Sequence, residues 1–174
     1  MGRTFFASDH HFGHEGILTF KNYDGTQVRT FDSIEHMNEH MIERHNSVVK
    51  PEDKVYFLGD VAMSHRHLHY LGRMNGEKVL IKGNHDTGKL SQYAPYFKDI
   101  RGSHQFSGVV MTHIPLHPHC LDRWKLNIHG HLHNNYIKLE DGVTPDTRYY
   151  NVSMEVIDFT PVTLEQIKYE RGLL

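Results

Sequence analysis

Five short apolar segments are each followed directly by polar side chains, and this arrangement constrains the fold more than any other feature of the sequence. The segments are rich in β-branched and aromatic residues, which is typical of buried strands. They span residues 4–7, 55–58, 79–81, 109–111 and 126–128. Because ligands of α/β sheets bind beyond the carboxyl ends of strands, we expect the polar residues to meet at one edge of the protein.

The polar clusters contain side chains that can bind metal ions. Asp9 and His11 follow the first apolar segment, and His131 and His133 follow the last. Because residues i and i+2 of an extended chain point to the same side, Asp9 and His11 can both reach one ion, and His131 and His133 have the same spacing. The remaining clusters are Gly59-Asp60, Gly83-Asn84-His85-Asp86 and His113.

Helical patterns separate the early strands. Apolar residues recur at helical spacing over 34–48 and over 68–74, and the sequence of residues 163–169 indicates a third helix. Asp32 and Glu35 are three residues apart and resemble a capping box at the start of the first helix. These patterns predict helices between and after the strands.

The later strands follow one another more closely along the chain than the early strands do. Residues 149–157 alternate in places, which indicates a hairpin or an edge pair of strands. Strands that alternate with helices and are then followed by closely spaced strands favour an α/β fold of the layered sandwich type. No Pro/Gly/Ser-rich linker and no repeat divides the sequence, so we expect a single domain over residues 1–174.

The composition excludes several classes of protein. The 174 residues include 17 histidines, which points to metal or acid–base chemistry. A net charge of −2 argues against a generally basic nucleic-acid or membrane-surface binder. A single cysteine, Cys120, excludes an intramolecular disulfide and a cysteine-rich zinc site. Because there is no long apolar run and no signal-peptide core, we expect a cytoplasmic protein without membrane contact.

In their order along the chain, the five clusters resemble the calcineurin-like metallophosphoesterases, whose pattern is D-x-H, G-D, G-N-H-D/E, H and G-H-x-H. The matching positions lie within residues 9–133. Residues 9–14, together with 150–153 and 161–165, resemble a small stand-alone bacterial and phage branch of that family. The resemblance implies two mixed β-sheets packed face to face, with flanking helices and the site at one rim.

The resemblance also implies two divalent metal ions that share one carboxylate, that of Asp60. The nitrogen and oxygen ligands suit Mn as the first candidate, with Fe, Zn, Co or Ni as alternatives. The implied ligands are Asp9, His11, Asp60 and His133 for the first ion, and Asp60, Asn84, His113 and His131 for the second.

The implied reaction is the hydrolysis of a phosphomonoester or phosphodiester by a hydroxide that bridges the two ions. His85 would protonate the leaving group as the general acid, and Asp86 would orient His85. The expected partner is a small phosphoester or a nucleotide, and a nucleic acid is a further candidate. His14, Lys82 and Arg123 adjoin the clusters in sequence and are candidates for binding the substrate phosphate.

Two histidines beside the clusters are expected to lie outside the ligand set. His10 points to the side opposite His11 if the chain is extended there. His129 has the same parity as His131, but the intervening Gly130 favours a bend, so we expect a supporting role for it.

Three other functions remain open at the level of sequence. A DNA or RNA nuclease needs a basic, aromatic-lined groove, and the basic residues here are scattered. A non-catalytic interaction scaffold of the same fold has no need for His85, which is present. A histidine-rich metal-storage protein has no need for ordered spacing across five strand ends.

Overall fold

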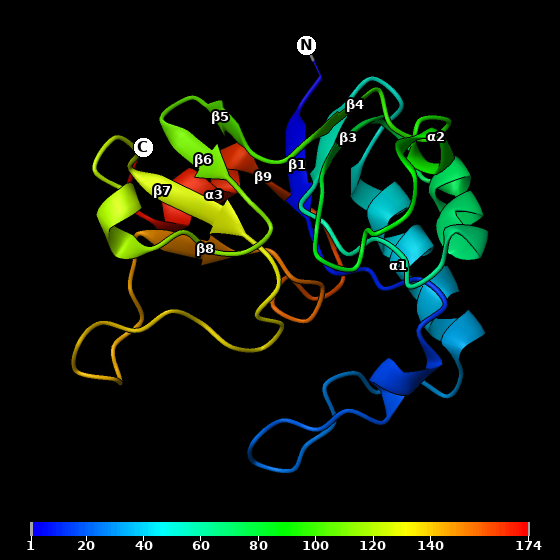
Figure 1. Cartoon of the computed structure of the whole chain (residues 1–174), viewed down its shortest axis with the longest axis horizontal. Coiled ribbons are helices and arrows are strands. Elements are labelled where there is room, and N and C mark those ends of the chain that lie inside the picture. Colours follow the sequence, from blue (N-terminus) through cyan, green and yellow to red (C-terminus); the bar gives the residue numbers. More distant parts are fainter. Residues whose placement is uncertain (1, 174) are drawn as a thin grey trace.

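The computed structural model of the protein describes residues 2–173. Within this range the strands form two sheets, with the orders β4-β3-β2-β1-β9 and β5-β6-β7-β8 (Figure 1). The strands are β1 (Thr4–Ala7), β2 (Lys54–Phe57), β3 (Glu77–Ile81), β4 (Asp99–Arg101), β5 (His104–Phe106), β6 (Val109–Met111), β7 (Leu126–His129), β8 (Tyr149–Asn151) and β9 (Val162–Thr163).

Both sheets are mixed, and each contains a run of parallel strands. Strands β1 to β4 are parallel, whereas β9 pairs antiparallel with β1. Strands β6, β7 and β8 are parallel, whereas β5 pairs antiparallel with β6. The five apolar segments correspond to β1, β2, β3, β6 and β7, so each predicted strand exists. The carboxyl ends of β1, β2 and β3 therefore lie along one edge of the first sheet, and those of β6 and β7 lie along one edge of the second.

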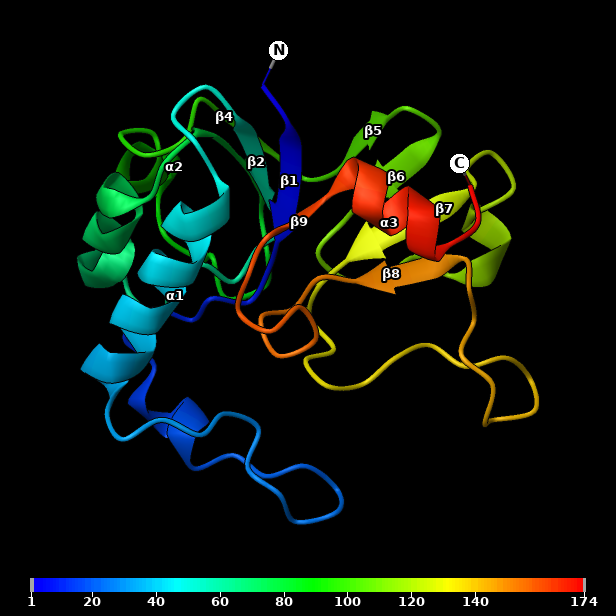
Figure 2. The ribbon, with the colours of Figure 1, turned by 180° about the vertical axis from the view of Figure 1, so that it is seen from behind.

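The helices flank the sheets. They are α1 (Ile34–Val48), α2 (Leu90–Tyr93) and α3 (Leu164–Glu170), with a 3₁₀ segment over His65–Arg73. Figures 1 and 2 show α1 and α2 on the side of the five-stranded sheet that lies away from β5–β8. The predicted helix over residues 68–74 is confirmed as a helix, in the tighter 3₁₀ form. The C-terminal helix starts one residue later than expected, after its N-cap Thr163.

The predicted capping box at Asp32 is wrong by one residue. Ser33 is the N-cap of α1, and its side chain accepts a hydrogen bond from the backbone N–H of His36 at 3.1 Å. Asp32 instead lies beside the His36 ring, with Oδ2 3.4 Å from Nδ1. Serine and aspartate are equally good caps, so the sequence alone does not discriminate between adjacent candidates.

The predicted hairpin over residues 149–157 is also wrong, although its first part is an edge strand. Tyr149–Asn151 forms the parallel edge strand β8 next to β7, and Ser153 makes an isolated parallel bridge with Ser8, which follows β1 of the other sheet. Residues 154–159 form turns, and the chain then crosses to the other sheet as β9. The short elements α2, β4 and β5 are too brief to leave a periodic pattern in the sequence.

One hydrophobic cluster connects the two sheets. It includes Phe6 and Phe57 from the five-stranded sheet and Met111 and Ile128 from the four-stranded sheet. An α/β sandwich results, as expected from the sequence. None of the helices within residues 2–173 has the length and apolar character needed to span a bilayer.

Candidate metal centre

The predicted metal ligands gather where parallel strands of the two sheets end. Two groups of His and Asp side chains each bring their ligand atoms within 4.8 Å of one another. Group one consists of Asp9, His11 and His133, and group two consists of Asp60, His113 and His131. Each group takes residues from the carboxyl ends of both sheets, so both lie at the junction between the sheets.

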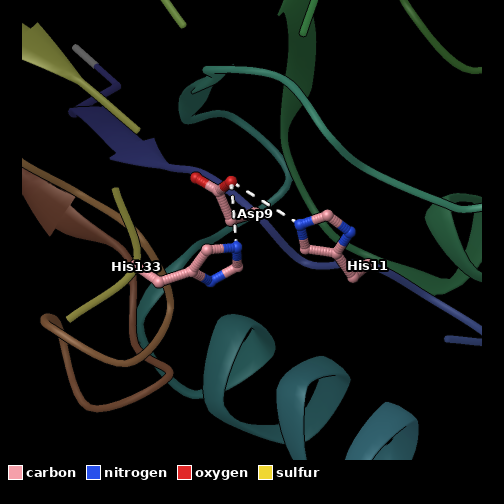
Figure 3. Close-up of side chains that lie close together, drawn as sticks. All are labelled: Asp9, His11 and His133. Atoms are coloured by element: carbon pink, nitrogen blue, oxygen red, sulfur yellow. Dashed lines mark ion pairs between the residues drawn. The ribbon is translucent and has the colours of Figure 1, made fainter. Parts of the chain in front are cut away.

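In group one, the carboxylate of Asp9 faces two imidazoles (Figure 3). Oδ1 of Asp9 lies 3.6 Å from Nε2 of His11 and 4.0 Å from Nε2 of His133. Oδ1 of Asp9 and both ring nitrogens of His11 are buried without a hydrogen-bond partner among the described residues. Unpartnered buried polar atoms are costly, and a cation between them would satisfy the carboxylate and Nε2 of His11.

Group two lies beside group one, and its Asp60 faces a ring nitrogen of each group. Oδ2 of Asp60 lies 3.3 Å from Nε2 of His113 and 3.9 Å from Nε2 of His11. Oδ1 of Asn84 lies 2.9 Å from Nε2 of His113, so the predicted amide ligand is also present. A single carboxylate oxygen therefore stands between the two groups, at the position expected for a bridging ligand.

The local electric field keeps the carboxylates ionised. Burial works to raise the pKa of Asp9, but the neighbouring imidazoles outweigh it and lower this pKa well below its ordinary value. Burial likewise opposes ionisation of Asp60, whose pKa is nonetheless lowered by the ring of His113. Burial also works to lower the pKa of His113, but the contact with Asp60 outweighs it, so this pKa is raised. Two anionic carboxylates surrounded by imidazole nitrogens are a suitable environment for cations.

The ligands do not lie on extended chain, contrary to the argument from residue parity. The backbone is left-handed, with φ between 48° and 70°, at the residues Asp9, His11, Asp60, His131 and His133. This conformation costs an L-residue about 1–2 kcal/mol. Asp9 and His11 lie together in group one, whereas His131 belongs to group two and His133 to group one, which is the division that the resemblance implies. The left-handed turns, and not strand alternation, aim these side chains.

The glycines of the motifs are required by close packing. A Cβ atom on Gly83 would lie 2.1 Å from Oδ1 of Asp60, and one on Gly130 would lie 2.0 Å from Oγ of Ser8. A side chain at either position would therefore displace the Asp60 carboxylate or the segment that leads to Asp9. These two glycines allow the loops of both sheets to approach the metal groups.

Comparison with known proteins shows which family the chain belongs to. No family model matches it. The chain is 34% identical over 173 residues to "Uncharacterized protein MJ1445" of Methanocaldococcus jannaschii, and the match covers 96% of the chain and 90% of that protein. The chain belongs to the family of MJ1445.

Two further proteins are similar to this MJ1445-family chain. The "Gene 66 protein" of Mycobacterium phage L5 is 33% identical over 91 residues, which is 49% of the chain and 41% of the phage protein. The solved structure of the protein of unknown function AQ665 from Aquifex aeolicus superposes with a TM-score of 0.73 at 24% identity. That match covers 98% of the chain and 100% of AQ665, so the two proteins share a fold.

His85 and Asp86 follow the predicted ligand Asn84, but they do not form the expected pair. His85 is exposed, and its ring centroid is 5.7 Å from that of His11. The buried carboxylate of Asp86 accepts hydrogen bonds from the backbone N–H groups of Asp60 at 2.9 Å, Val61 at 3.2 Å and Gly83 at 2.8 Å. Asp86 therefore holds the loop that carries Asp60, and it does not orient His85.

The three candidate phosphate-binding residues differ in position. The ring of His14 lies 5.6 Å from that of His11, and burial, together with His11 and His85, lowers the pKa of His14 to about 4, so it is neutral at pH 7. Lys82 follows the carboxyl end of β3, at the sheet edge that carries the predicted ligands. Its ammonium lies 5.9 Å from the centroid of the Tyr93 ring. Their phosphate contacts stay predictions.

Arg123 is placed away from both metal groups, which corrects the expectation for this residue. It precedes β7, whereas the ligands follow the carboxyl ends of β6 and β7. The adjacent Lys125 donates its backbone N–H to the carbonyl of Gly108, which precedes β6. Arg123 therefore lies at the end of the parallel strands opposite the ligands. Proximity in sequence to the last cluster was misleading because the four residues of β7 separate them.

The two histidines expected outside the ligand set do lie outside both groups. The ring of His10 is buried 4.9 Å from the ring of Phe57 and belongs to the hydrophobic interior. Nδ1 of His129 lies 2.8 Å from the Gly130 carbonyl oxygen, and burial lowers the pKa of His129 to about 4. Both rings therefore contact groups of the protein outside the two candidate metal groups.

Three buried residues beside group one are not predicted from the sequence. Ser153 donates its hydroxyl to Oδ2 of Asp9 at 3.1 Å. Oε1 of Glu155 lies 2.9 Å from Nδ1 of His133 and 2.7 Å from Nε of Arg29. The segment after β8 is thus a sixth strand end that contributes to the site. The one available signal was its position, since these polar residues follow a buried parallel strand just as the recognised clusters do.

A cavity of about 740 Å³ adjoins both groups at His131 and His133. One wall is formed by residues 20–24 with 28, and the other by residues 131–135. The amide of Asn134 donates a hydrogen bond to Oδ1 of Asn22 at 3.1 Å and joins the two walls. The loop that contains Asn22 extends from the body of the protein at the bottom of Figures 1 and 2. The cavity therefore opens onto His131 of group two and His133 of group one.

Proposed function

We propose that this chain is a dinuclear metal-dependent phosphoesterase of the calcineurin-like metallophosphoesterase type. The observation that carries the proposal is the position of the Asp60 carboxylate, whose Oδ2 lies within 4 Å of an imidazole nitrogen of each group. A carboxylate between two clusters of histidine and aspartate can be shared by two ions, as a two-metal hydrolytic site would use it. The ordered motifs from Asp9 to His133 support the same proposal.

The donor atoms fit two divalent ions with mixed nitrogen and oxygen ligands. Asp9, His11 and His133 would hold one ion, and Asn84, His113 and His131 the other, with Asp60 shared. Mn is the first candidate, and Fe, Zn, Co or Ni also suit imidazole and carboxylate ligands. Such a pair of ions supplies a nucleophilic water at neutral pH and offsets the negative charge of a phosphoryl group.

The residues of the chain supply the remaining steps. The backbone N–H of His85 donates to Oδ1 of Asp60 at 2.8 Å, so the His85 loop is tied to the shared carboxylate. The exposed imidazole of His85 is free to donate a proton to the leaving oxygen of a phosphoester. His14, on the other side of His11, would donate a hydrogen bond to a non-bridging phosphate oxygen. The organic part of a small phosphoester or nucleotide would lie in the cavity beside His131 and His133.

The proposal is tested with four substrates in parallel, at saturating Mn²⁺. They are p-nitrophenyl phosphate, bis-p-nitrophenyl phosphate, a 2′,3′-cyclic nucleotide and single-stranded DNA. We expect hydrolysis of at least one of the first three, abolished by a chelator and restored by metal. Metal-loaded protein that hydrolyses none of the four would refute the proposal, and cleavage of DNA alone would replace it with a nuclease.

The His85→Ala variant separates catalysis from metal binding. Both ions should stay bound, and the rate should drop by about 10²- to 10⁴-fold, the usual contribution of a positioned general acid. Activity on nucleotides should fall most because an alkoxide needs the proton more than p-nitrophenolate does. The matched control is His36→Ala, since His36 is an exposed histidine of α1 whose ring contacts Asp32. Equal losses on both kinds of substrate would assign His85 to phosphate binding instead.

A further inference from the structure

Arg29 and Glu155 form a buried ion pair behind group one. Nε of Arg29 donates to Oε1 of Glu155 at 2.7 Å, and the two side chains are 0% and 2% exposed. The pair joins positions 126 residues apart in sequence. Burying two charges is expensive, and such a pair contributes little net stability compared with apolar residues of the same size. Its position at the metal ligands therefore calls for a reason other than stability.

The pair contacts group one from two directions. Arg29 donates to the backbone carbonyls of Asp9 and of His10, the latter at 2.8 Å, where the chain leaves β1. Oε1 of Glu155, which also accepts from Arg29, lies 2.9 Å from Nδ1 of His133, where the chain has left β7. One side-chain pair thus fixes the exits of a strand in each sheet.

The contact with Glu155 determines which nitrogen of His133 faces the ion. An ionised carboxylate can only accept hydrogen bonds, so Nδ1 of His133 must carry the hydrogen. The lone pair is then on Nε2, which is the nitrogen directed toward Oδ1 of Asp9. With the other tautomer Nε2 would present an N–H to the ion, and a ring turned over about its Cβ–Cγ bond would present Cε1–H; neither could bind it.

Group two achieves the same result with the backbone. Nδ1 of His113 lies 2.7 Å from the carbonyl oxygen of Leu58, which can only accept, so Nε2 of His113 is bare toward Asp60. No substitution at Leu58 removes that carbonyl. In group one the acceptor is a side chain, and a single substitution can remove it without touching a ligand.

We infer that Glu155 is a positioning residue that fixes the tautomer and orientation of His133 for metal binding, and that Arg29 holds Glu155 in place. The inference rests on the proposed metal binding at group one but not on the proposed phosphoesterase activity. It assigns Glu155 to one group only, so its loss should affect the ion at group one and spare the ion at group two.

The first test uses the unmodified protein without metal. Long-range ¹H–¹⁵N NMR spectra at alkaline pH, where the rings are neutral, report which ring nitrogen carries the hydrogen. We expect His133 and His113 both to show the Nδ1–H tautomer, with His113 as the internal reference. An Nε2–H tautomer at His133 would overturn the inference whatever the variants do.

The second test compares two substitutions of the same residue by calorimetric titration with Mn²⁺. Glu155→Gln keeps an oxygen that can accept from both Arg29 and His133, whereas Glu155→Met keeps the length of the side chain and removes the acceptor. We expect Glu155→Met to weaken one of two sites by at least about 10- to 100-fold, the usual effect of losing such a contact. Glu155→Gln should weaken that site less, and the other site should keep its affinity in both variants.

The outcomes separate positioning from a purely structural role. If both sites weaken equally in Glu155→Met while the protein stays folded by circular dichroism, the pair only stabilises the fold and the inference is wrong. If Glu155→Met does not fold because Arg29 is left unpaired, the comparison of Glu155→Gln with wild type decides. A Glu155→Gln variant whose His133 switches to Nε2–H without losing affinity for Mn²⁺ at one site would also overturn it. Retained metal binding without hydrolysis would refute the proposed function and leave this inference intact.

Discussion

The two candidate metal groups have similar side chains but differ in what holds these side chains in place. In group two, a backbone carbonyl fixes His113 and three backbone N–H groups hold the Asp86 carboxylate behind Asp60. In group one, a buried charged pair from distant parts of the chain, Arg29 and Glu155, performs the equivalent task. Group two therefore depends mainly on the path of the backbone, whereas group one depends on individual side chains.

This difference predicts an unequal response to substitution. Changes behind group two must disturb the backbone before they reach the ligands, so they affect folding as well as metal binding. Changes behind group one can remove an acceptor and leave the strands in place. The two groups should accordingly be separable by mutation, except at Asp60, which lies next to both.

The largest effect is expected where the groups cannot be separated. Asp60→Asn keeps the shape of the side chain and the acceptor for the backbone N–H of His85, but it removes the charge shared by both groups. Activity should fall by more than the 10- to 100-fold typical of supporting contacts, with the fold retained. Turnover assays and circular dichroism check this. Near-wild-type turnover at micromolar metal would show that Asp60 does not serve both groups.

A smaller effect distinguishes group two from its neighbouring histidine. His131→Ala should remove a ligand of group two and weaken one metal site strongly, whereas group one keeps its ion. His129→Ala should retain both ions and lose about tenfold in rate, because the ring lies against the Gly130 carbonyl and outside both groups. Calorimetric metal titration of both variants tests the ranking. The reverse ranking would exchange the roles of the two histidines.

The smallest effect concerns stability without metal. His133 has φ 48°, which glycine adopts more readily than alanine. His133→Gly should therefore be more stable than His133→Ala by about 1 kcal/mol in urea unfolding of the metal-free protein. His36 in α1 provides the matched control, since glycine should there be about 1 kcal/mol less stable than alanine. The same order of stability at both positions would mean that His133 is not strained.

The sequence predicts the strands and the ligands better than it predicts how the ligands are held. Apolar segments that end in His, Asp or Asn identify β1, β2, β3, β6 and β7 and every member of both groups. Local patterns contain this information because a strand and the residue after it are neighbours in sequence. The left-handed backbone at Asp9 has no such signal, since parity arguments assume extended chain.

Tertiary contacts account for the remaining differences. Nothing near Arg29 in the sequence identifies Glu155 as its partner, because the two meet only once both sheets have formed. Asp86 stands beside His85 in sequence, yet it turns inward to three backbone N–H groups. The prediction therefore paired Asp86 with His85 because they are adjacent in sequence, and it missed the pairing of Arg29 with Glu155 because they are distant.

The left-handed ligands also bear on how such a chain can change over generations. Five residues have a left-handed backbone in which glycine would relieve strain. A random substitution of one of them by glycine therefore lowers the conformational strain of the folded chain. A descendant that lost the proposed metal binding would lose these side chains under selection for stability alone, starting at the strand exits. Under the proposed function, keeping all five against that drift requires continuous selection for metal binding.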